Sequence, residues 1–348
     1  MLQTTHTGSG RTRRALGCAA LLGILAAAPA LAQDASVVYL EGEPELRTPQ
    51  GTTDWLDFGM SLAAGDSVVT GSNDFVELEQ GSASTIQVDP DTVFTIREVE
   101  VDGQRQTVMS NSVGSVRYRF NRIAGRGEPR IGTSSVVAGI RGTEVTVYAG
   151  ADGSSLFLVD SGEVEVTSAG QSVSLTENEG VEVPVGGPPG EKFEVIGREL
   201  NFADWAASRR GDFLDDPLGS LDGVATRLDE FSTEAATWYQ NYLDAKEQSD
   251  AARERIGEIQ DEQERQTYRD ETWRPLADQT GAAILNYRYH ALSALSLRRY
   301  VLGPMYMEMK TRNILQQDAQ YREFVDRFDE IVGSFEDAFV QYLEDTDI

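Results

Sequence analysis

Hydrophobic and polar residues alternate along the first half of the chain, from about residue 37 to residue 195. A period of two places one set of side chains in a core and the other in water, so it predicts β-strands. Turn sequences such as Asp89-Pro90-Asp91 and Asp152-Gly153 separate the runs. Short strands at close intervals predict an all-β sandwich, barrel or solenoid-like domain. The clearest runs are Val76/Leu78, Ile86/Val88, Val99/Val101, Val145/Val147, Leu156/Leu158, Val164/Val166, Val173/Leu175 and Val181/Val183.

The pattern becomes helical near Leu218, where apolar residues recur at alternating spacings of three and four. Such spacing predicts a long helix with a coiled-coil-like seam. Because proline disfavours a helical conformation at the preceding residue, Trp273-Arg274-Pro275 is expected to end or kink this helix. A second helix is expected over 276–302, where Gly303-Pro304 interrupts it, and a third over 321–343. The seam consists of Leu221, Val224, Leu228, Phe231, Ala235, Trp238, Tyr242, Ala245, Ser249, Ala252, Ile256 and Ile259.

These two periods predict a mainly β plus α chain with an N-terminal β domain and a C-terminal helical bundle or hairpin. The expected boundaries are a β domain over 33–197, a linker over 198–217 and the helical region over 218–348. Two interpretations of the seam over 221–259 remain open: it pairs with another helix of the same chain, or it pairs with a second copy of the chain. A homo-oligomer through this helix is therefore one expectation.

Residues 1–32 have the three parts of a signal peptide. Arg11, Arg13 and Arg14 precede an apolar run over 15–28, and Ala30-Leu31-Ala32 forms an Ala-x-Ala cleavage pattern. The run is shorter than the roughly 20 residues that a spanning helix needs. We therefore expect export to the periplasm or outer surface of a bacterial cell, with no membrane span in the mature chain. Because the single cysteine, Cys18, lies in this segment, disulfides, thiol catalysis and cysteine-ligated zinc are not expected.

The chain is strongly acidic, with 57 Asp and Glu against 30 Lys and Arg, giving a net charge of −27. That charge repels phosphate backbones and anionic lipid, so nucleic-acid binding is not expected. One interpretation is attraction of cations or of a basic partner. The favoured one is a solvated acidic surface, because the acids are spread along the whole chain.

Four blocks of sequence, taken in order, resemble the FecR-domain family. They are Trp55 to Gly71, Asp74-Phe75-Val76-Glu77-Leu78, Gly114-Ser115-Val116 with the later Arg141-Gly142-Thr143, and Ser161-Gly162-Glu163-Val164. The resemblance implies a stand-alone periplasmic β module that binds a partner and needs no cofactor. The regulators that named the family carry a cytoplasmic anti-sigma segment and a membrane helix before this module. A signal peptide is expected there in this chain, so sigma-factor signalling is not carried over. The motif residues are Trp55, Gly65, Asp66, Thr70, Gly71, Arg141, Gly142, Thr143, Glu144 and Gly162.

These motif residues are expected to shape the fold. Gly142 allows a backbone conformation or a close approach that a Cβ would obstruct. The planar guanidinium of Arg141 can bond carbonyls or a carboxylate and so tie adjacent strands together. Thr143 suits the start of a strand. The alternative role for Arg141 is capture of an anionic ligand.

Catalytic chemistry has little support in the sequence. His290, which directly follows Tyr289, is the only histidine after the signal segment. Histidine-based triads and metal sites are therefore not expected. The enzymatic alternative is a carbohydrate-active enzyme with an acid pair on the β domain. Its candidate carboxylates are Asp89, Asp91, Glu98, Glu144, Glu163 and Glu165.

Together these features predict an exported, non-catalytic interaction module of the cell envelope. The β domain would recognise an envelope protein or glycan, and the helical domain would serve assembly. Besides the enzyme, the remaining alternative is a purely structural envelope protein.

Overall fold

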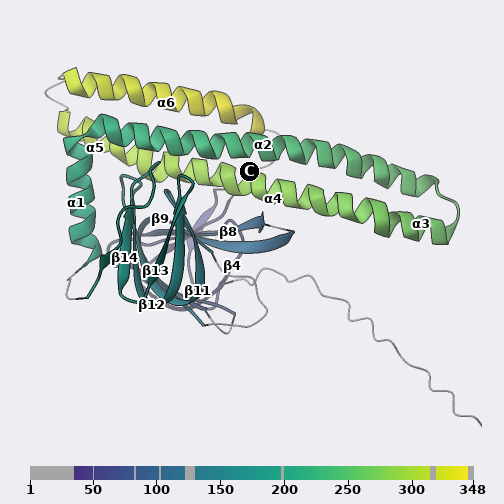
Figure 1. Cartoon of the computed structure of the whole chain (residues 1–348), viewed down its shortest axis with the longest axis horizontal. Helices are drawn as coiled ribbons and strands as arrows, with labels where there is room; N and C mark the ends of the chain where they lie inside the picture. The colour runs from purple at the N-terminus through teal and green to yellow at the C-terminus, as the bar shows by residue number, and fades with distance from the viewer. Residues whose placement is uncertain are drawn as a thin grey trace, which may run out of the picture. The chain divides into compact units, whose positions relative to one another are not determined.

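The computed structural model describes residues 35–49, 51–81, 84–101, 103–121, 130–196, 200–313 and 319–343, without the side chains of 141, 313 and 340–343. The signal peptide expected over 1–32 lies outside this part of the chain. The fold class is as predicted, a β-rich region followed by long helices (Figure 1).

In the described residues the β region forms one hydrogen-bonded sheet of fifteen strands. Most neighbouring strands are antiparallel, whereas β9 and β10 pair in parallel. The strands are β1 (Ala35–Glu41), β2 (Glu45–Arg47), β3 (Thr53–Trp55), β4 (Ser61–Leu62), β5 (Ser67–Val69), β6 (Phe75–Gln80), β7 (Ser84–Val88), β8 (Val93–Val101), β9 (Gln104–Phe120), β10 (Arg130–Thr133), β11 (Val137–Ala149), β12 (Ser155–Ser168), β13 (Gln171–Thr176), β14 (Glu179–Val183) and β15 (Phe193–Glu194).

The three longest strands change partners midway, and each does so at a glycine. β9 pairs with β8 before Gly114 and with β7 and β11 after it. Gly114 has φ +101°, and a Cβ there would lie 2.2 Å from Thr92 Oγ1, so only glycine fits. The β11–β12 pairing shifts register between Arg141 and Val145, close to Gly142, and Gly162 lies in the facing part of β12. These breaks let one sheet bend over a single core.

Most of the alternating residues predicted to point inward form that core. Leu156 and Leu158 instead lie in a second cluster around Trp205, and Val99 lies in a third cluster with Tyr289. Val76, Leu78, Val164 and Val166 are fully buried, as are Ile86 and the other inward residues of the neighbouring strands. The intervening Glu163 and Glu165 are exposed. The period of two therefore reports a sheet with one face in the core and one face in water.

The helical region contains α1 (Phe202–Asp215), α2 (Pro217–Glu258), α3 (Glu262–Tyr268), α4 (Arg274–Leu297), α5 (Gly303–Asn313) and α6 (Ala319–Leu343), with π-helical turns η1 (Arg269–Trp273) and η2 (Arg298–Leu302). The linker expected over 198–217 is instead largely helical, because α1 occupies it. Asn201 caps α1 by accepting a hydrogen bond from the Asp204 amide at 2.9 Å. Trp205 then packs against Tyr148 of the sheet, with ring centroids 5.8 Å apart. Burial of that aromatic contact explains why the segment is ordered.

Most of the predicted seam of α2 is buried and pairs within the chain, whereas Trp238, Tyr242 and Ile256 are only partly buried. α2 lies beside α4, and α6 lies along the N-terminal part of α2 (Figure 1). Tyr239 occupies the buried position expected for Trp238, because its ring packs on Tyr287 at 5.3 Å. A homo-oligomer through this helix stays a prediction.

The first long helix ends at Glu258, and the chain reverses direction at residues 259–261. The prediction that this helix ends or kinks at Trp273-Arg274-Pro275 is therefore wrong in its position. Asp261 caps α3 by accepting a hydrogen bond from the Glu264 amide at 2.8 Å. From there the chain stays helical through both prolines. Each proline follows a π turn, in which the preceding residue donates its N–H five residues back, Arg274 to Arg269 O and Gly303 to Arg298 O. The wider turn accommodates a residue that has no N–H to donate.

The described residues form one compact unit, in which the sheet and the helices are in direct contact. Asn286 of α4 accepts a hydrogen bond from the Glu100 amide at 2.7 Å and donates one to the Glu100 carbonyl at 3.1 Å. It thereby pairs with β8 as a neighbouring strand would. Among the described residues, none of the helices combines the length and apolar character that crossing a membrane would require.

Candidate binding cleft

Thr70 and Gly71, from the first motif block, fix one corner of the sheet. Thr70 is buried, and its hydroxyl donates to Asp89 O at 2.7 Å and accepts from the Thr92 amide at 2.9 Å. The Gly71 amide donates to the Asp74 carboxylate at 2.7 Å. These bonds satisfy buried backbone groups, so the role of this block is structural.

The second motif cluster joins β11 to β12. The hydroxyl of buried Thr143 donates to Glu163 O at 2.9 Å and accepts from the Glu163 amide at 3.3 Å. Gly162 has φ +88°, and a Cβ there would lie 2.4 Å from Gly142 O. The side chain of Arg141 lies outside the described residues, so its two predicted roles both stay open.

Trp55 does not join either cluster. It lies on β3 with 60% of its surface exposed. These motif residues therefore lie at two corners of the sheet and at one exposed position, whereas Gly65 and Asp66 lie beside the cleft described below, so the motif residues do not converge on one site.

The six candidate acids of the enzymatic alternative lie on the β region and have structural partners there or face solvent. Glu144 forms an ion pair with Arg119 at 2.8 Å, and this hydrogen bond holds the pKa of Glu144 below its ordinary value. Asp89 accepts a hydrogen bond from the Ser115 hydroxyl, and Glu98 lies 3.8 Å from Arg105. None of the six lines the cleft described next.

A cleft of about 570 Å³ lies between the sheet and the helices. Its sheet wall comes from the β2 end, β5 and β8, and its helix wall from α4, η2, the start of α5 and α6. No Asp or Glu is among the described residues that line it, which are Arg47, Thr48, Pro49, Gly65, Ser67, Thr95, Arg97, Leu292, Leu295, Ser296, Arg298, Arg299, Tyr300, Leu302, Gly303, Phe328 and Val332.

Arg97 is the most unusual residue of this cleft. Its side chain extends from β8 to α4, where it donates to Ser293 Oγ at 2.5 Å and to Ser296 Oγ at 2.6 Å. The residue is only 6% exposed, and its Nε has no hydrogen-bond partner. No carboxylate lies within ion-pair distance of it among the described residues. Burial lowers the pKa of Arg97, but a guanidinium stays protonated in proteins, so a buried positive charge remains uncompensated.

The motif residues Gly65 and Asp66 help to position Arg97. The Gly65 amide donates to Ile96 O at 2.7 Å, and the Ile96 amide donates to Asp66 O at 3.1 Å. Ile96 directly precedes Arg97, so these two bonds fix the backbone from which the arginine extends. Beside them, the Ser67 and Thr95 hydroxyls share a hydrogen bond of 2.8 Å in the cleft wall.

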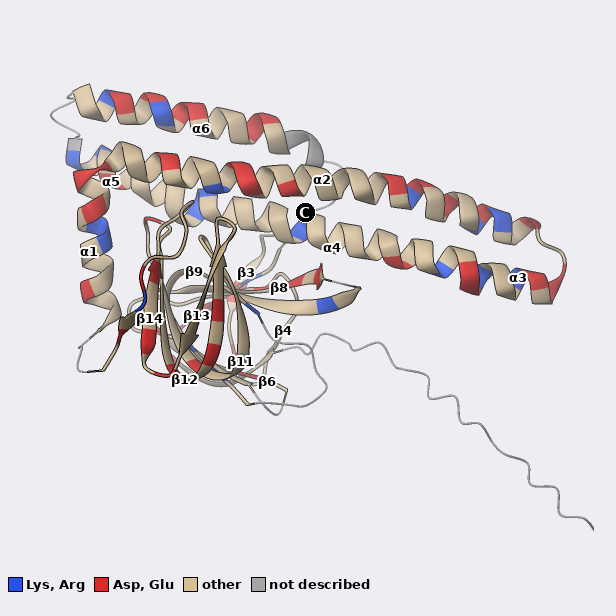
Figure 2. Cartoon of the chain, in the orientation of Figure 1, with Lys and Arg blue, Asp and Glu red and all other residues tan. Residues whose placement is uncertain are grey.

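Three further arginines surround the cleft. Arg47 pairs with Glu45 at 2.7 Å, and Arg298 pairs with Glu336 at 2.9 Å. Arg299 is exposed and lies over the Tyr300 ring, and no acid pairs with it in the described part of the chain. Elsewhere acids are spread over both strands and helices (Figure 2). The cleft is therefore a local concentration of positive charge in an acidic protein.

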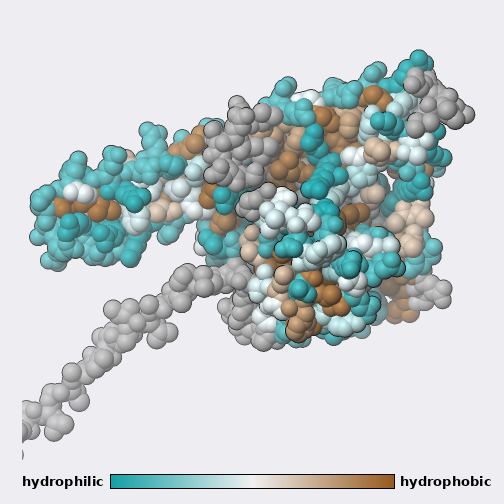
Figure 3. Space-filling model, turned by 180° about the vertical axis from the view of Figure 1, so that it is seen from behind, coloured by the Kyte–Doolittle hydropathy of each residue, from teal (hydrophilic) through white to brown (hydrophobic). Residues whose placement is uncertain are grey.

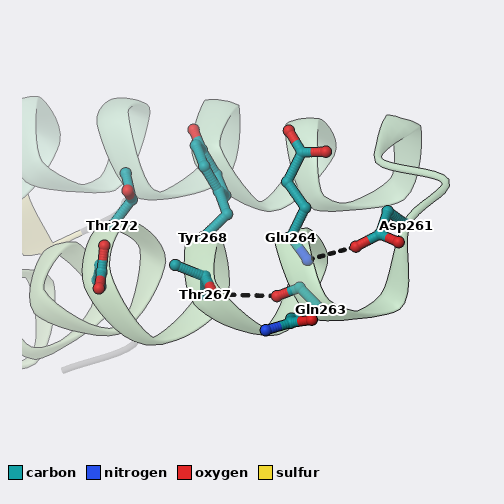
Figure 4. Close-up of a pocket in the computed structure, with 7 residues that line it drawn as sticks. Asp261, Gln263, Glu264, Thr267, Tyr268 and Thr272 are labelled. Atoms are coloured by element: carbon teal, nitrogen blue, oxygen red, sulfur yellow. Dashed lines mark hydrogen bonds between the residues drawn. The ribbon is translucent and has the colours of Figure 1, made fainter.

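A second hollow, of about 410 Å³, lies at the tip of the helical hairpin (Figure 4). Asp261 there accepts the capping bond from Glu264, and the Thr267 hydroxyl donates to Gln263 O at 3.0 Å. These contacts belong to the helix itself. In the described residues no three His, Cys, Asp or Glu side chains gather as a metal site, and the visible face of the tip is mainly hydrophilic (Figure 3).

His290 is not part of the cleft. It lies on α4 between Tyr289 and Phe231, with ring centroids 5.1 and 6.3 Å away. Burial lowers its pKa to about 4, so it is neutral at physiological pH. This agrees with a structural histidine.

The sequence does not reveal the cleft, because its walls come from segments about 200 residues apart. Arg97 lies in an ordinary β-strand pattern, and Arg298-Arg299 lies in a helical one. The only local signal is the basic pair Arg298-Arg299 in an otherwise acidic chain.

No family model matches the chain, and neither does any curated protein. Two crystal structures of a candidate anti-sigma factor from Parabacteroides distasonis ATCC 8503, at 2.50 and 1.65 Å resolution, are similar to part of it. In each comparison the identity is 18%, the TM-score is 0.32, and the match covers 37% of this chain and 59% of the other. The chain thus spans less than two thirds of that protein, and a similarity this low carries no functional assignment.

Proposed function

We propose that the chain is an exported, non-catalytic binding module of the cell envelope that takes an anionic group of its ligand into the arginine cleft. The observation that carries this proposal is Arg97, a buried guanidinium with no carboxylate partner among the described residues, in a cleft whose described lining contains no Asp or Glu. A buried charge without a counter-charge costs several kcal/mol. A bound anion would supply that counter-charge.

Binding without catalysis agrees with the groups present. The ionisable side chains that line the cleft are arginines and Tyr300. No Asp, Glu or His is among the described residues that line it, and these are the side chains that most often serve as general acids and bases. The partner expected from the sequence, an envelope protein or glycan, can carry an acidic group in either case.

Thermal unfolding in phosphate tests this proposal, with sodium chloride at matched ionic strength as reference. Phosphate should raise the Tm of the wild-type chain more than that of the Arg97→Gln/Arg299→Gln variant, since a ligand stabilises only the form that binds it. Phosphate also strengthens burial in general, so the comparison needs an arginine control. Arg119→Gln is a suitable control, because Arg119 is exposed and lies outside the cleft. An equal rise in all three proteins would exclude anion binding at the cleft.

A further inference from the structure

The helix wall of the cleft is largely apolar. Leu292 and Leu295 of α4 and Phe328 and Val332 of α6 line it and are only partly buried. Leu295, Phe328 and Val332 are continuous with the core of the helical region. Apolar surface facing an open cleft is unfavourable in water and favourable once a nonpolar group covers it.

The size of the cleft favours a small organic molecule over a bare ion. Its volume of about 570 Å³ falls within the roughly 300–1,000 Å³ of small-molecule sites. An inorganic anion beside Arg97 would leave Leu295 and Phe328 uncovered. A hydrophilic sugar acid would satisfy the arginines but place hydroxyl groups against the apolar wall, where they would lack partners.

We infer that the ligand is an amphiphilic carboxylate, an acidic head group joined to a hydrocarbon chain. This inference rests on the proposed function, because it assigns the head group to the same arginines. The carboxylate would lie at Arg97 and Arg299, which form no ion pair with an acid in the described part of the chain, and the hydrocarbon would cover Leu292, Leu295 and Val332. The exposed guanidinium fork of Arg299 can bind a carboxylate in a bidentate manner, which would fix the head group.

The acid is expected as a free molecule and not as part of a membrane surface. With a net charge of −27, the chain is repelled by an anionic bilayer. Vesicles containing phosphatidylglycerol should therefore not sediment the protein. Sedimentation that depends on Arg97 would overturn the inference in favour of a membrane headgroup.

Isothermal titration calorimetry of the full chain with butanoate, hexanoate and octanoate tests the inference. Affinity should rise about fourfold for each added methylene, the fold-change that corresponds to about 0.8 kcal/mol per buried CH₂. Octanol, which has the chain and no acid, should bind at least tenfold more weakly than octanoate.

Two pairs of variants separate the head-group and chain contacts. Arg97→Gln/Arg299→Gln should weaken all three acids alike, whereas Arg119→Gln should not. Leu295→Ala should reduce the gain per methylene, whereas Leu243→Ala, at an exposed position of α2, should leave it unchanged. Circular dichroism of each variant confirms folding.

The outcomes distinguish this inference from the function on which it rests. Equal affinity for butanoate and octanoate, with phosphate still stabilising the protein through Arg97, would overturn the amphiphile and leave the anion site standing. Absence of binding by every acid, together with no phosphate effect, would overturn both. Tighter binding of a short peptide that ends in an apolar residue with a free carboxylate would replace the acyl chain with a protein carboxy terminus.

Discussion

Replacing Gly162 with alanine should destabilise the β region by about 2–5 kcal/mol. The backbone there has φ +88°, and an L-residue in the left-handed region costs roughly 1–2 kcal/mol. The new Cβ would also lie 2.4 Å from Gly142 O and 2.8 Å from Thr143 Cα. Because both are backbone atoms, they cannot rotate away, and overpacking of this kind adds about 1–3 kcal/mol.

Gly170→Ala is the matched control for this prediction. Gly170 lies in the turn between β12 and β13 with φ +72°, and no atom lies within 4 Å of a Cβ built there. It therefore measures the cost of the backbone conformation alone, about 1–2 kcal/mol.

Urea unfolding, followed by circular dichroism and tryptophan fluorescence, gives the free energy of unfolding of both variants. An unchanged m-value shows that the unfolding reaction is the same. If the free energy of unfolding of Gly162→Ala is no lower than that of Gly170→Ala, the close approach of β11 and β12 is not the reason that position 162 requires glycine.

Three further predictions concern buried polar contacts. Thr143→Val removes the hydroxyl that bonds Glu163 twice, so urea unfolding should show a loss of about 1–3 kcal/mol, most of which Thr143→Ser should restore. Asn286→Leu leaves the Glu100 amide without its partner, so proteolysis between sheet and helices should accelerate, with a similar loss of stability. His290 has a folded-state pKa of about 4, below the value near 6.5 of an unfolded chain, so stability should fall by up to about 3 kcal/mol as pH decreases from about 6.5 to 4. His290→Phe should remove that part of the decline in unfolding experiments at both pH values; an unchanged decline would show that other groups cause it.

The strands and the long seam were predictable because both depend on local periodicity. Val76 and Leu78 alternate with glutamates that face away from the core, and Leu221, Val224 and Leu228 recur on one helical face. Each pattern reports which side of its own element is buried, whatever lies opposite.

The reversal at residues 259–261 was missed because Ile259 continues the helical spacing to the end of α2. Proline in Trp273-Arg274-Pro275 was the more conspicuous signal, although a π turn accommodates it. The sequence did contain the correct signal: Asp261 with Glu264 has the spacing of an N-cap followed by an acid at the third helical position.

The candidate cleft could not be predicted from the sequence, since its chemistry depends on tertiary contacts. An arginine in a strand ordinarily reaches water or an acid. Only the packing of β8 against α4 shows that Arg97 meets hydroxyl groups instead.

The π turn η2 also sets the rotational phase of everything that follows it. Leu297, Val301, Met305 and Met309 are all buried and are spaced four residues apart. In a regular α-helix such a series drifts by about 40° at each step and soon leaves the core, because residues follow one another at about 100°. The π turn slows that drift. Deleting one residue from η2 would therefore restore a regular helix and keep both methionines on the buried face, because the seven and eleven steps that would then separate them from Leu297 end within about 20° of whole turns. The π turn therefore absorbs one extra residue without a change of the buried face.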